Sequence, residues 1–338
     1  MTKFTEYLEI ILEGNDLTFK QATELLDMVF EGQVHELQIA AFLAAMRVKK
    51  ATSAEIAGLA KSLRDHALPI RPKVKNIIDT CGTGGAKIKT FNLSTASAFV
   101  AAGAGAYVAK HGNRGITSKC GSADVLAALG VKIDAESAII EHCIEEAHIG
   151  FMFAPMFHPA MKFVQPIRKT LDFRTAFNIL GPLANPARAN AQVMGVADEA
   201  LMDRIAESLK MLGLTKVMVV HSEGLDEIST MAPTKISQLD ESGIKHYQIK
   251  AEDFGIKPAT IEQLQGDDAQ ANAKIIRNVL SGKEAGARKD IVILNAAAAI
   301  IVAGIADNFA KGIELARISV ESGKAMECLE KLIKISNS

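Results

Sequence analysis

Two glycine-bearing turns have the residue types and spacing of phosphate-binding sites. The first, Cys81-Gly82-Thr83-Gly84-Gly85, follows an expected strand over 74–79 and precedes an expected helix over 94–103. The second, Lys110-His111-Gly112-Asn113-Arg114-Gly115, follows an expected strand over 106–109, and Gly121-Ser122 opens a helix over 122–129. Glycines let the backbone approach a ligand closely, and the N–H groups of a helix start favour anions. The pair predicts a phosphate site facing a diphosphate site, although either turn alone is also consistent with a plain strand-to-helix connection.

The absence of acidic residues around these turns strengthens the prediction. No Asp or Glu occurs from Thr80 to Ala123, so the local field is positive. The same stretch contains cations and hydroxyls: Lys87, Lys89, Thr90, Ser94, Thr95, Lys110, Arg114, Lys119 and Ser122. The Walker pattern is absent, and Lys87 stands where a dinucleotide-binding fingerprint has its third glycine. A P-loop ATPase and a Rossmann cofactor site are therefore both disfavoured.

The acidic segment 221–227 is the candidate metal site. It directly follows an expected strand over 216–220 and contains Asp226 and Glu227. Phosphate esters commonly bind together with Mg²⁺ held by one or two carboxylates, and ligands of parallel sheets bind beyond the carboxyl ends of strands. A solvated acidic turn is the alternative interpretation. Neither a zinc motif of the H-E-x-x-H type nor a Ser/His/Asp arrangement can be recognised in the sequence.

The hydrophobic pattern divides the chain into two parts. Residues 1–68 have helical periodicity only, with capping boxes at Thr18/Gln21 and Thr52/Glu55. From residue 71 onward strands alternate with helices, including an expected strand over 290–294 and a helix over 296–303. This pattern predicts a small all-helical domain over 1–70 and a large α/β domain over 71–338 with a mainly parallel central sheet. We expect part of the proline-rich segment 160–190 to pack on the helical domain.

Composition excludes several classes of protein. The chain has 338 residues, a formal net charge of −1, no Trp and 5% aromatic residues, which argues against nucleic-acid binding. The uncharged run 90–109 contains polar residues and glycines, so we expect no membrane span. The four cysteines include no C-x-x-C pair, which favours a reducing, cytoplasmic compartment.

At these motifs the sequence resembles the anthranilate phosphoribosyltransferase family, over nearly its whole length. The resemblance is carried by Gly82-Thr83-Gly84-Gly85, Asn92-Leu93-Ser94-Thr95, Lys110-His111-Gly112-Asn113-Arg114, Gly121-Ser122-Ala123-Asp124, Phe153 to Lys162, Arg174 to Leu183, and Asp226-Glu227. It implies the phosphoribosyltransferase and nucleoside phosphorylase class of fold, and a homodimer formed through the N-terminal helices. It also implies transfer of the phosphoribosyl group of 5-phosphoribosyl-1-pyrophosphate to the amino group of anthranilate, with release of pyrophosphate, in tryptophan biosynthesis.

The resemblance further implies a role for individual residues. The phosphoribosyl donor would be bound by Gly82, Gly85, Ala86, Thr90, Asn92, Ser94, Thr95, Lys110, Asn113, Arg114, Ser118 and Ser122. Anthranilate would be bound by Gly82, His111, Asn113, Pro155, Phe157 and Arg168. Mg²⁺ would be held by Ser94, Asp226 and Glu227. Lys110, His111 and Arg168 would act by electrostatics and positioning, because a neutral aromatic amine needs no strong base to attack.

The first turn departs from the family pattern. The family usually has Gly-Thr-Gly-Gly-Asp-Gly, whereas Ala86 and Lys87 occupy the last two places here, and Lys89 follows. The turn has thus lost a carboxylate and gained cations. We expect donor binding to persist and the handling of the metal to change.

Two rival functions stay open at the level of sequence. A pyrimidine-nucleoside phosphorylase shares the expected architecture, and phosphorolysis of uridine or thymidine would identify it. A non-catalytic relative that binds nucleic acid is the second rival, and a salt-sensitive interaction with single-stranded DNA would identify it.

Overall fold

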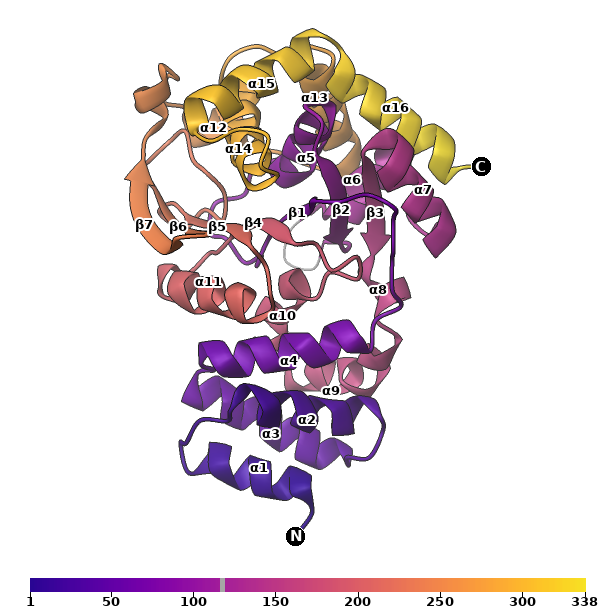
Figure 1. The fold of residues 1–338 in the computed structure, drawn as a ribbon, viewed down its shortest axis with the longest axis vertical. Helices are drawn as coiled ribbons and strands as arrows, with labels where there is room; N and C mark the ends of the chain where they lie inside the picture. Colours follow the sequence, from indigo (N-terminus) through magenta and orange to yellow (C-terminus); the bar gives the residue numbers. More distant parts are fainter. Residues whose placement is uncertain (116–118) are drawn as a thin grey trace.

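Four N-terminal helices form a bundle below a larger α/β unit (Figure 1). The computed structural model describes residues 1–115 and 119–338. The bundle helices are α1 (Lys3–Leu12), α2 (Phe19–Phe30), α3 (Glu36–Lys49) and α4 (Ser53–Asp65). Both expected capping boxes are present, at Thr18/Gln21 and Thr52/Glu55, and each supplies partners for backbone N–H groups at a helix start.

The α/β unit is built on one seven-stranded sheet with the order β3-β2-β1-β4-β5-β6-β7. Its strands are β1 (Ile77–Gly82), β2 (Tyr107–Gly112), β3 (Ile149–Phe153), β4 (Ala191–Gly195), β5 (Lys216–His221), β6 (Thr234–Asp240) and β7 (Gly243–Ile249). The first five are parallel, and β6 and β7 are antiparallel, so the sheet is mixed but mainly parallel as expected. The strand order reverses between β1 and β4, which is where open α/β sheets bind ligands.

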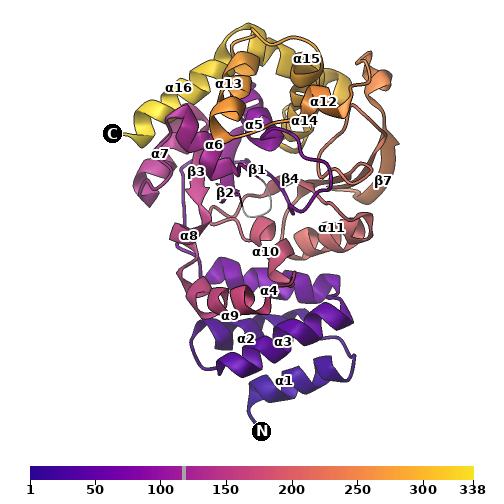
Figure 2. The same cartoon turned by 180° about the vertical axis from the view of Figure 1, so that it is seen from behind.

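Helices surround the sheet on both faces (Figures 1 and 2). The longer ones are α5 (Leu93–Gly103), α6 (Ser122–Leu129), α7 (Ser137–Ala147), α11 (Met202–Met211), α13 (Ala269–Leu280), α14 (Ala287–Val302), α15 (Phe309–Glu321) and α16 (Lys324–Ser336). The short ones are α8 (Ala154–Phe157), α9 (Gln165–Leu171), α10 (Phe177–Leu183) and α12 (Ile261–Leu264). Short 3₁₀ turns lie at Pro159–Phe163, Glu199–Leu201 and Ala251–Phe254.

Alternate residues of the strands contribute to two different hydrophobic cores, because successive side chains of a strand point to opposite faces of the sheet. On β5, Met218 and Val220 belong to the cluster that contains the buried residues of α5 and α14. Val217 and Val219 belong to the other cluster, which also contains the buried side chains of the helical bundle. That second cluster includes buried residues from the 160–184 segment, which therefore packs with the bundle and one face of the sheet. A domain boundary near residue 70 stays a prediction.

The expected strand over 290–294 is wrong. Residues 290–294 lie inside α14, which runs unbroken from Ala287 to Val302 and is buried over most of its length. A short, wholly apolar run has no periodicity that separates a buried strand from a buried helix. The alanines that follow it continue the helix, and they let α14 pack closely against α5 and α15.

Within the described ranges no helix is long and apolar enough to cross a membrane. The four cysteines, all in described parts of the chain, form no disulfide.

Candidate functional site

The first glycine turn and the acidic segment lie together at the carboxyl ends of β1 and β4. The N–H of Gly84 donates to Oδ2 of Asp226 at 3.2 Å, and the N–H of Lys87 donates to the carbonyl of Gly224 at 3.1 Å. A Cβ on Gly82 would overlap the Asp226 carboxylate, so only glycine fits at this close approach. The strand order therefore joins two segments that the sequence separates widely.

A buried lysine faces the same place from the neighbouring strand. Lys110, on β2, donates from Nζ to the carbonyl of Thr80 at 2.6 Å and lies 3.4 Å from Oγ of Ser94 at the start of α5. Burial lowers the pKa of Lys110, and the nearby Asp79 carboxylate opposes that fall. A desolvated cation at a helix start is suited to a phosphate or diphosphate group.

The second turn is held in shape by one carboxylate. Asp124, at the third position of α6, accepts from the N–H groups of Gly115 and Gly121 at 2.8 and 2.9 Å. It also accepts from the Arg114 guanidinium at 2.9 Å. Burial would raise the pKa of Asp124, but these three donors lower it on balance. The Arg114 side chain is thus already paired with a carboxylate within the turn.

The segments that follow the two turns contact each other. Asn92, which precedes α5, donates from Nδ2 to the carbonyl of Cys120, just before α6, at 3.3 Å. The Nδ2 group of Asn272, on α13, donates to Oδ1 of Asn92 at 3.0 Å and fixes its orientation. The Thr95 hydroxyl, at the first turn of α5, is buried and has no hydrogen-bond partner among the described residues. An unsatisfied hydroxyl beside a helix start is a suitable donor to an anion.

The chemistry of the acidic pair fits a hard divalent cation. Burial and the adjacent Asp226 carboxylate raise the pKa of Glu227 to about 8, and burial raises the pKa of Asp226. The N–H of Ser94 donates to Glu227, so the start of α5 lies beside the pair. Two carboxylates and a hydroxyl are oxygen ligands of the kind Mg²⁺ prefers. Among the described residues no group of three or more His, Cys, Asp and Glu gathers as a metal site.

Two histidines form a buried pair below the second turn. The Nε2 atoms of His111 and His158 lie 3.2 Å apart, and both rings are buried. Burial lowers the pKa of His111 to about 3 and that of His158 to about 4. Both imidazoles are therefore neutral at neutral pH, so His111 would present a neutral ring to an aromatic substrate.

This pair predicts a loss of stability in mild acid. Between the unfolded pKa near 6.5 and the lower folded values, the unfolded chain binds protons that the native chain does not. The free energy of unfolding should fall as the pH drops below about 6.5, by up to ~1.4 kcal/mol per pH unit for each ring. Urea unfolding at pH 7 and pH 5 measures the slope. His158→Gln should flatten it and His142→Gln, on an exposed residue, should not; equal slopes in all three proteins would contradict the assignment.

Arg168, on α9, is a half-buried cation whose guanidinium has no carboxylate partner in the described parts of the chain. The guanidinium lies 5.5 Å from the ring centroid of Phe177, and burial lowers its pKa. A guanidinium without an acidic partner suits a carboxylate ligand, which it can bind through two parallel hydrogen bonds.

The remaining residues expected at the site fall in different places. The first turn and the residues just after it contain Gly85, Ala86 and Thr90. The second turn contains Asn113, whose carbonyl lies 3.4 Å from Oγ of Ser122 at the start of α6. Pro155, on α8, is exposed. Phe157 is buried in the same cluster as Ile70 and Met152, and its contact with anthranilate stays a prediction. Ser118 lies outside the described residues.

The sequence did not reveal the buried residues that position the site residues through hydrogen bonds. Asp79 is buried and accepts from the Asn185 amide at 2.7 Å, from the Thr80 N–H at 2.8 Å and from the His111 N–H at 3.4 Å. Burial raises the pKa of Asp79, and the Lys110 charge opposes that rise. A single Asp in an otherwise apolar strand was the available signal for this role. Nothing in the sequence indicated that Asn185 or Asn272 would contribute to the site.

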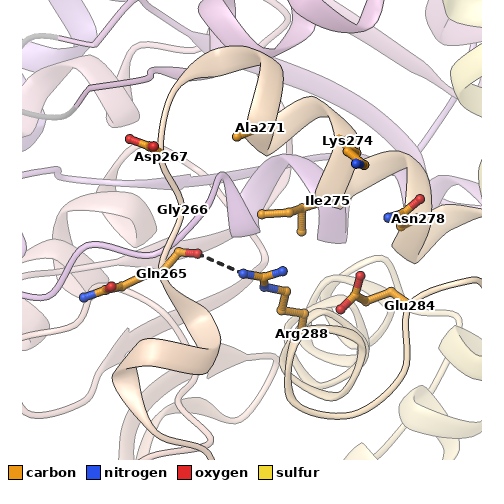
Figure 3. Close-up of a pocket in the computed structure, with 9 residues that line it drawn as sticks. All are labelled: Gln265, Gly266, Asp267, Ala271, Lys274, Ile275, Asn278, Glu284 and Arg288. Atoms are coloured by element: carbon orange, nitrogen blue, oxygen red, sulfur yellow. Dashed lines mark hydrogen bonds between the residues drawn. The ribbon is translucent and has the colours of Figure 1, made fainter.

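A surface pocket of about 350 Å³ lies between α12, α13 and α14 (Figure 3). Its lining includes Lys274, Glu284 and Arg288, and the Arg288 guanidinium donates to the carbonyls of Gln263 and Gln265. The residues expected to bind substrate do not line it. One residue of the pocket wall, Gly266, packs on the backbone of Phe91, which directly precedes Asn92.

The sequence matches a known protein family over both of its parts. Residues 5–67 match the helical bundle domain of a glycosyl transferase family, and residues 74–326 match the α/β domain of that family. The anthranilate phosphoribosyltransferase of Desulfatibacillum aliphaticivorans is 47% identical over 98% of both chains, and that of Roseiflexus castenholzii is 48% identical over 97% of this chain and 96% of the relative. The chain belongs to the anthranilate phosphoribosyltransferase family.

Solved structures of the family have the same fold. The anthranilate phosphoribosyltransferase of Thermus thermophilus superposes with a TM-score of 0.93 at 38% identity, covering 98% of this chain and 99% of that one. The Saccharomyces cerevisiae enzyme in complex with PRPP and Mg superposes with a TM-score of 0.89 at 28% identity, covering 99% and 98%. Another structure of that yeast enzyme contains 4-fluoroanthranilate.

Family membership gives the chain anthranilate phosphoribosyltransferase activity, in tryptophan biosynthesis. The sequence-based prediction of fold class and activity is confirmed, and the two rival functions lose their support.

Proposed function

We propose that phosphoribosyl pyrophosphate lies along the line from the acidic pair to the second turn. Its diphosphate would bind between the first turn, the start of α5 and Lys110, and its 5-phosphate against Asn113 and Ser122. The observation that carries this placement is the contact network among the two turns, Lys110 and the Asp226–Glu227 pair. We keep Arg114 and Ser118 as predicted donor ligands.

We propose that anthranilate binds with its carboxylate at Arg168 and its ring near His111 and Pro155. This orientation directs the amine toward C1′ of the donor, close to Gly82 and Asn113. Holding two reactants in line supplies much of the rate acceleration, because the amine is already neutral and nucleophilic. Burial lowers the pKa of both His111 and His158, so both rings are neutral at neutral pH, in agreement with an amine that needs no strong base.

The reaction follows from this placement. The amine nitrogen forms a bond to C1′ while the C1′–O bond breaks, and the electron pair leaves with pyrophosphate. The nitrogen then loses one proton, which passes to water or to the departing pyrophosphate. Lys110 and the N–H groups at the start of α5 would stabilise the negative charge on the leaving group. Ser94, Asp226 and Glu227 would hold Mg²⁺, which neutralises diphosphate charge when it is bound.

A direct assay tests the whole assignment. Protein, phosphoribosyl pyrophosphate, Mg²⁺ and anthranilate are mixed, and the loss of anthranilate fluorescence is followed. The signal should fall only when all four components are present, and pyrophosphate should appear in equal amount. Unchanged fluorescence at high protein concentration would refute the proposal, and phosphorolysis of uridine in its place would point to the phosphorylase.

The unusual first turn predicts an altered dependence on Mg²⁺. Lys87 packs beside Gly224, and the charge of Lys89 acts on the Asp226 carboxyl, so cations of the chain already lie at the acidic pair. Donor affinity should therefore rise less steeply with Mg²⁺ concentration in the native chain than in the variant Ala86→Asp/Lys87→Gly. Calorimetric titration of the donor across a Mg²⁺ series measures both curves. Identical curves would contradict the prediction that the first turn changes the Mg²⁺ dependence of donor binding.

We propose a homodimer formed through the bundle, and a cytoplasmic location. Leu12 on α1 and Leu37 and Val48 on α3 are 58%, 71% and 83% exposed, and they are the apolar side chains of the bundle that such a contact would cover. Sedimentation of the native chain and of Leu37→Asp tests the dimer. A monomeric native chain would contradict it. The reduced state of the cysteines supports the location.

A further inference from the structure

Arg174 projects onto the first glycine turn from the loop between α9 and α10. Its Nη2 group lies 3.5 Å from the carbonyl of Gly84. A Cβ added to Gly85 would overlap the guanidinium and displace it, and Gly85 has a φ of +79°, so the backbone conformation favours glycine there. The guanidinium thus takes the place that a side chain at position 85 would occupy.

The backbone of Arg174 is held by the helical bundle. Arg47, on α3, donates from Nη1 to the Arg174 carbonyl at 2.5 Å. The Arg47 guanidinium also lies 5.4 Å from the ring centroid of Phe173. A continuous series of contacts therefore runs from the bundle through residues 173–174 to the first turn, and from Gly84 on to Asp226.

Most of the hydrogen-bonding capacity of Arg174 is unused. A guanidinium has five N–H donors, and the Gly84 carbonyl is the acceptor that the described residues provide for this side chain, at a long distance. The side chain is exposed and forms no ion pair with any carboxylate of the described ranges. Burial raises the pKa of Asp226, and the charges of Lys89 and Arg174 oppose that rise, so Arg174 acts electrostatically at the acidic pair.

We propose that Arg174 binds the diphosphate of the donor and that Arg47 positions it for this task. The assignment rests on the proposed placement of the diphosphate at the first turn. A planar guanidinium can donate two parallel hydrogen bonds to phosphate oxygens. Because negative charge grows on the pyrophosphate as the C1′–O bond breaks, this contact strengthens toward the transition state, and the guanidinium keeps all its protons.

Two ligands separate this role from a structural one. Pyrophosphate contains the group that Arg174 would bind, whereas ribose 5-phosphate contains only the other phosphate. Calorimetry with each ligand, in the presence of Mg²⁺, compares the native chain with Arg174→Gln, Arg174→Lys and Arg47→Gln. Arg317→Gln, on the exposed face of α15, is the matched control.

We expect Arg174→Gln to weaken pyrophosphate binding about 10- to 100-fold, a change typical of losing a charge-assisted bidentate contact, and to leave ribose 5-phosphate binding unchanged. Arg174→Lys should recover part of the affinity, and Arg47→Gln should lose less than Arg174→Gln. Unchanged pyrophosphate affinity in Arg174→Gln, or equal losses for both ligands, would overturn the assignment. If the native chain bound neither ligand, the proposed function would fail first, and this assignment with it.

Discussion

Replacing Lys110 with methionine is expected to lower kcat/KM by about 100- to 1,000-fold, because it removes a preorganised cation from the place where the diphosphate gains charge. Lys110 is 2% exposed, and its Nζ group contacts the Thr80 carbonyl and Ser94 Oγ. A cation held this rigidly needs no reorganisation when the leaving group departs. Most of the loss should be in kcat, since the charge on the diphosphate is larger in the transition state than in the bound donor.

Stability is the competing explanation for such a loss. Lys110→Met leaves the buried Asp79 carboxylate without its nearest cation, and a buried charge without a partner is costly. The double variant Lys110→Met/Asp79→Asn removes both charges, so it should fold like the native chain and stay inactive. Thermal unfolding checks the fold, and steady-state kinetics check the activity.

A surface lysine of the same stretch provides the control. Lys119 forms an exposed ion pair with Asp267, and exposed pairs contribute little to stability. Lys119→Met should keep most of the native rate, because its ammonium is neither buried nor in contact with Ser94. A double variant that folds and turns over at the native rate would show that Lys110 has no part in the reaction.

Local signals in the sequence predicted the elements that carry the site, but the expected strands over 74–79 and 106–109 end three residues before β1 and β2 do. The expected helix over 122–129 coincides with α6, since glycine before it and Ser122 at its start mark the boundary. The expected strand over 216–220 differs from β5 by one residue at its end. Acid-free turns and a pair of neighbouring carboxylates are likewise short-range patterns, and the structure brings them together.

Contacts between distant segments could not be predicted in this way. Asp79 and Asn185 are 106 positions apart, and Asn92 and Asn272 are 180 positions apart, yet each pair is joined by a hydrogen bond. The partner of a buried polar side chain depends on which strands become neighbours, and periodicity carries no information about that choice.

Replacing Glu227 with glutamine is expected to weaken Mg²⁺-dependent binding of pyrophosphate by about 100-fold, because the cation loses one of its two carboxylate ligands. Glu223→Gln is the matched control. Glu223 lies in the same turn and is exposed, and its carboxylate has no part in the acidic pair. Calorimetric titration with and without Mg²⁺ separates loss of the metal from loss of the anion, since only the titration with Mg²⁺ should change. Equal affinities in Glu227→Gln and Glu223→Gln would contradict the assignment of Glu227 as a metal ligand.

The raised pKa of Glu227 gives this prediction a second, independent readout. Below about pH 8 the carboxyl is protonated in the metal-free protein, so Mg²⁺ must displace a proton in order to bind. The apparent affinity for Mg²⁺ should therefore rise about tenfold per pH unit as the pH increases toward 8, and become constant above it. Glu227→Gln has no proton to release, so its weaker affinity should vary much less over the same range. A native chain whose Mg²⁺ affinity is flat between pH 6 and 8 would mean that the carboxyl is already ionised, and that the neighbouring lysines rather than the metal balance its charge.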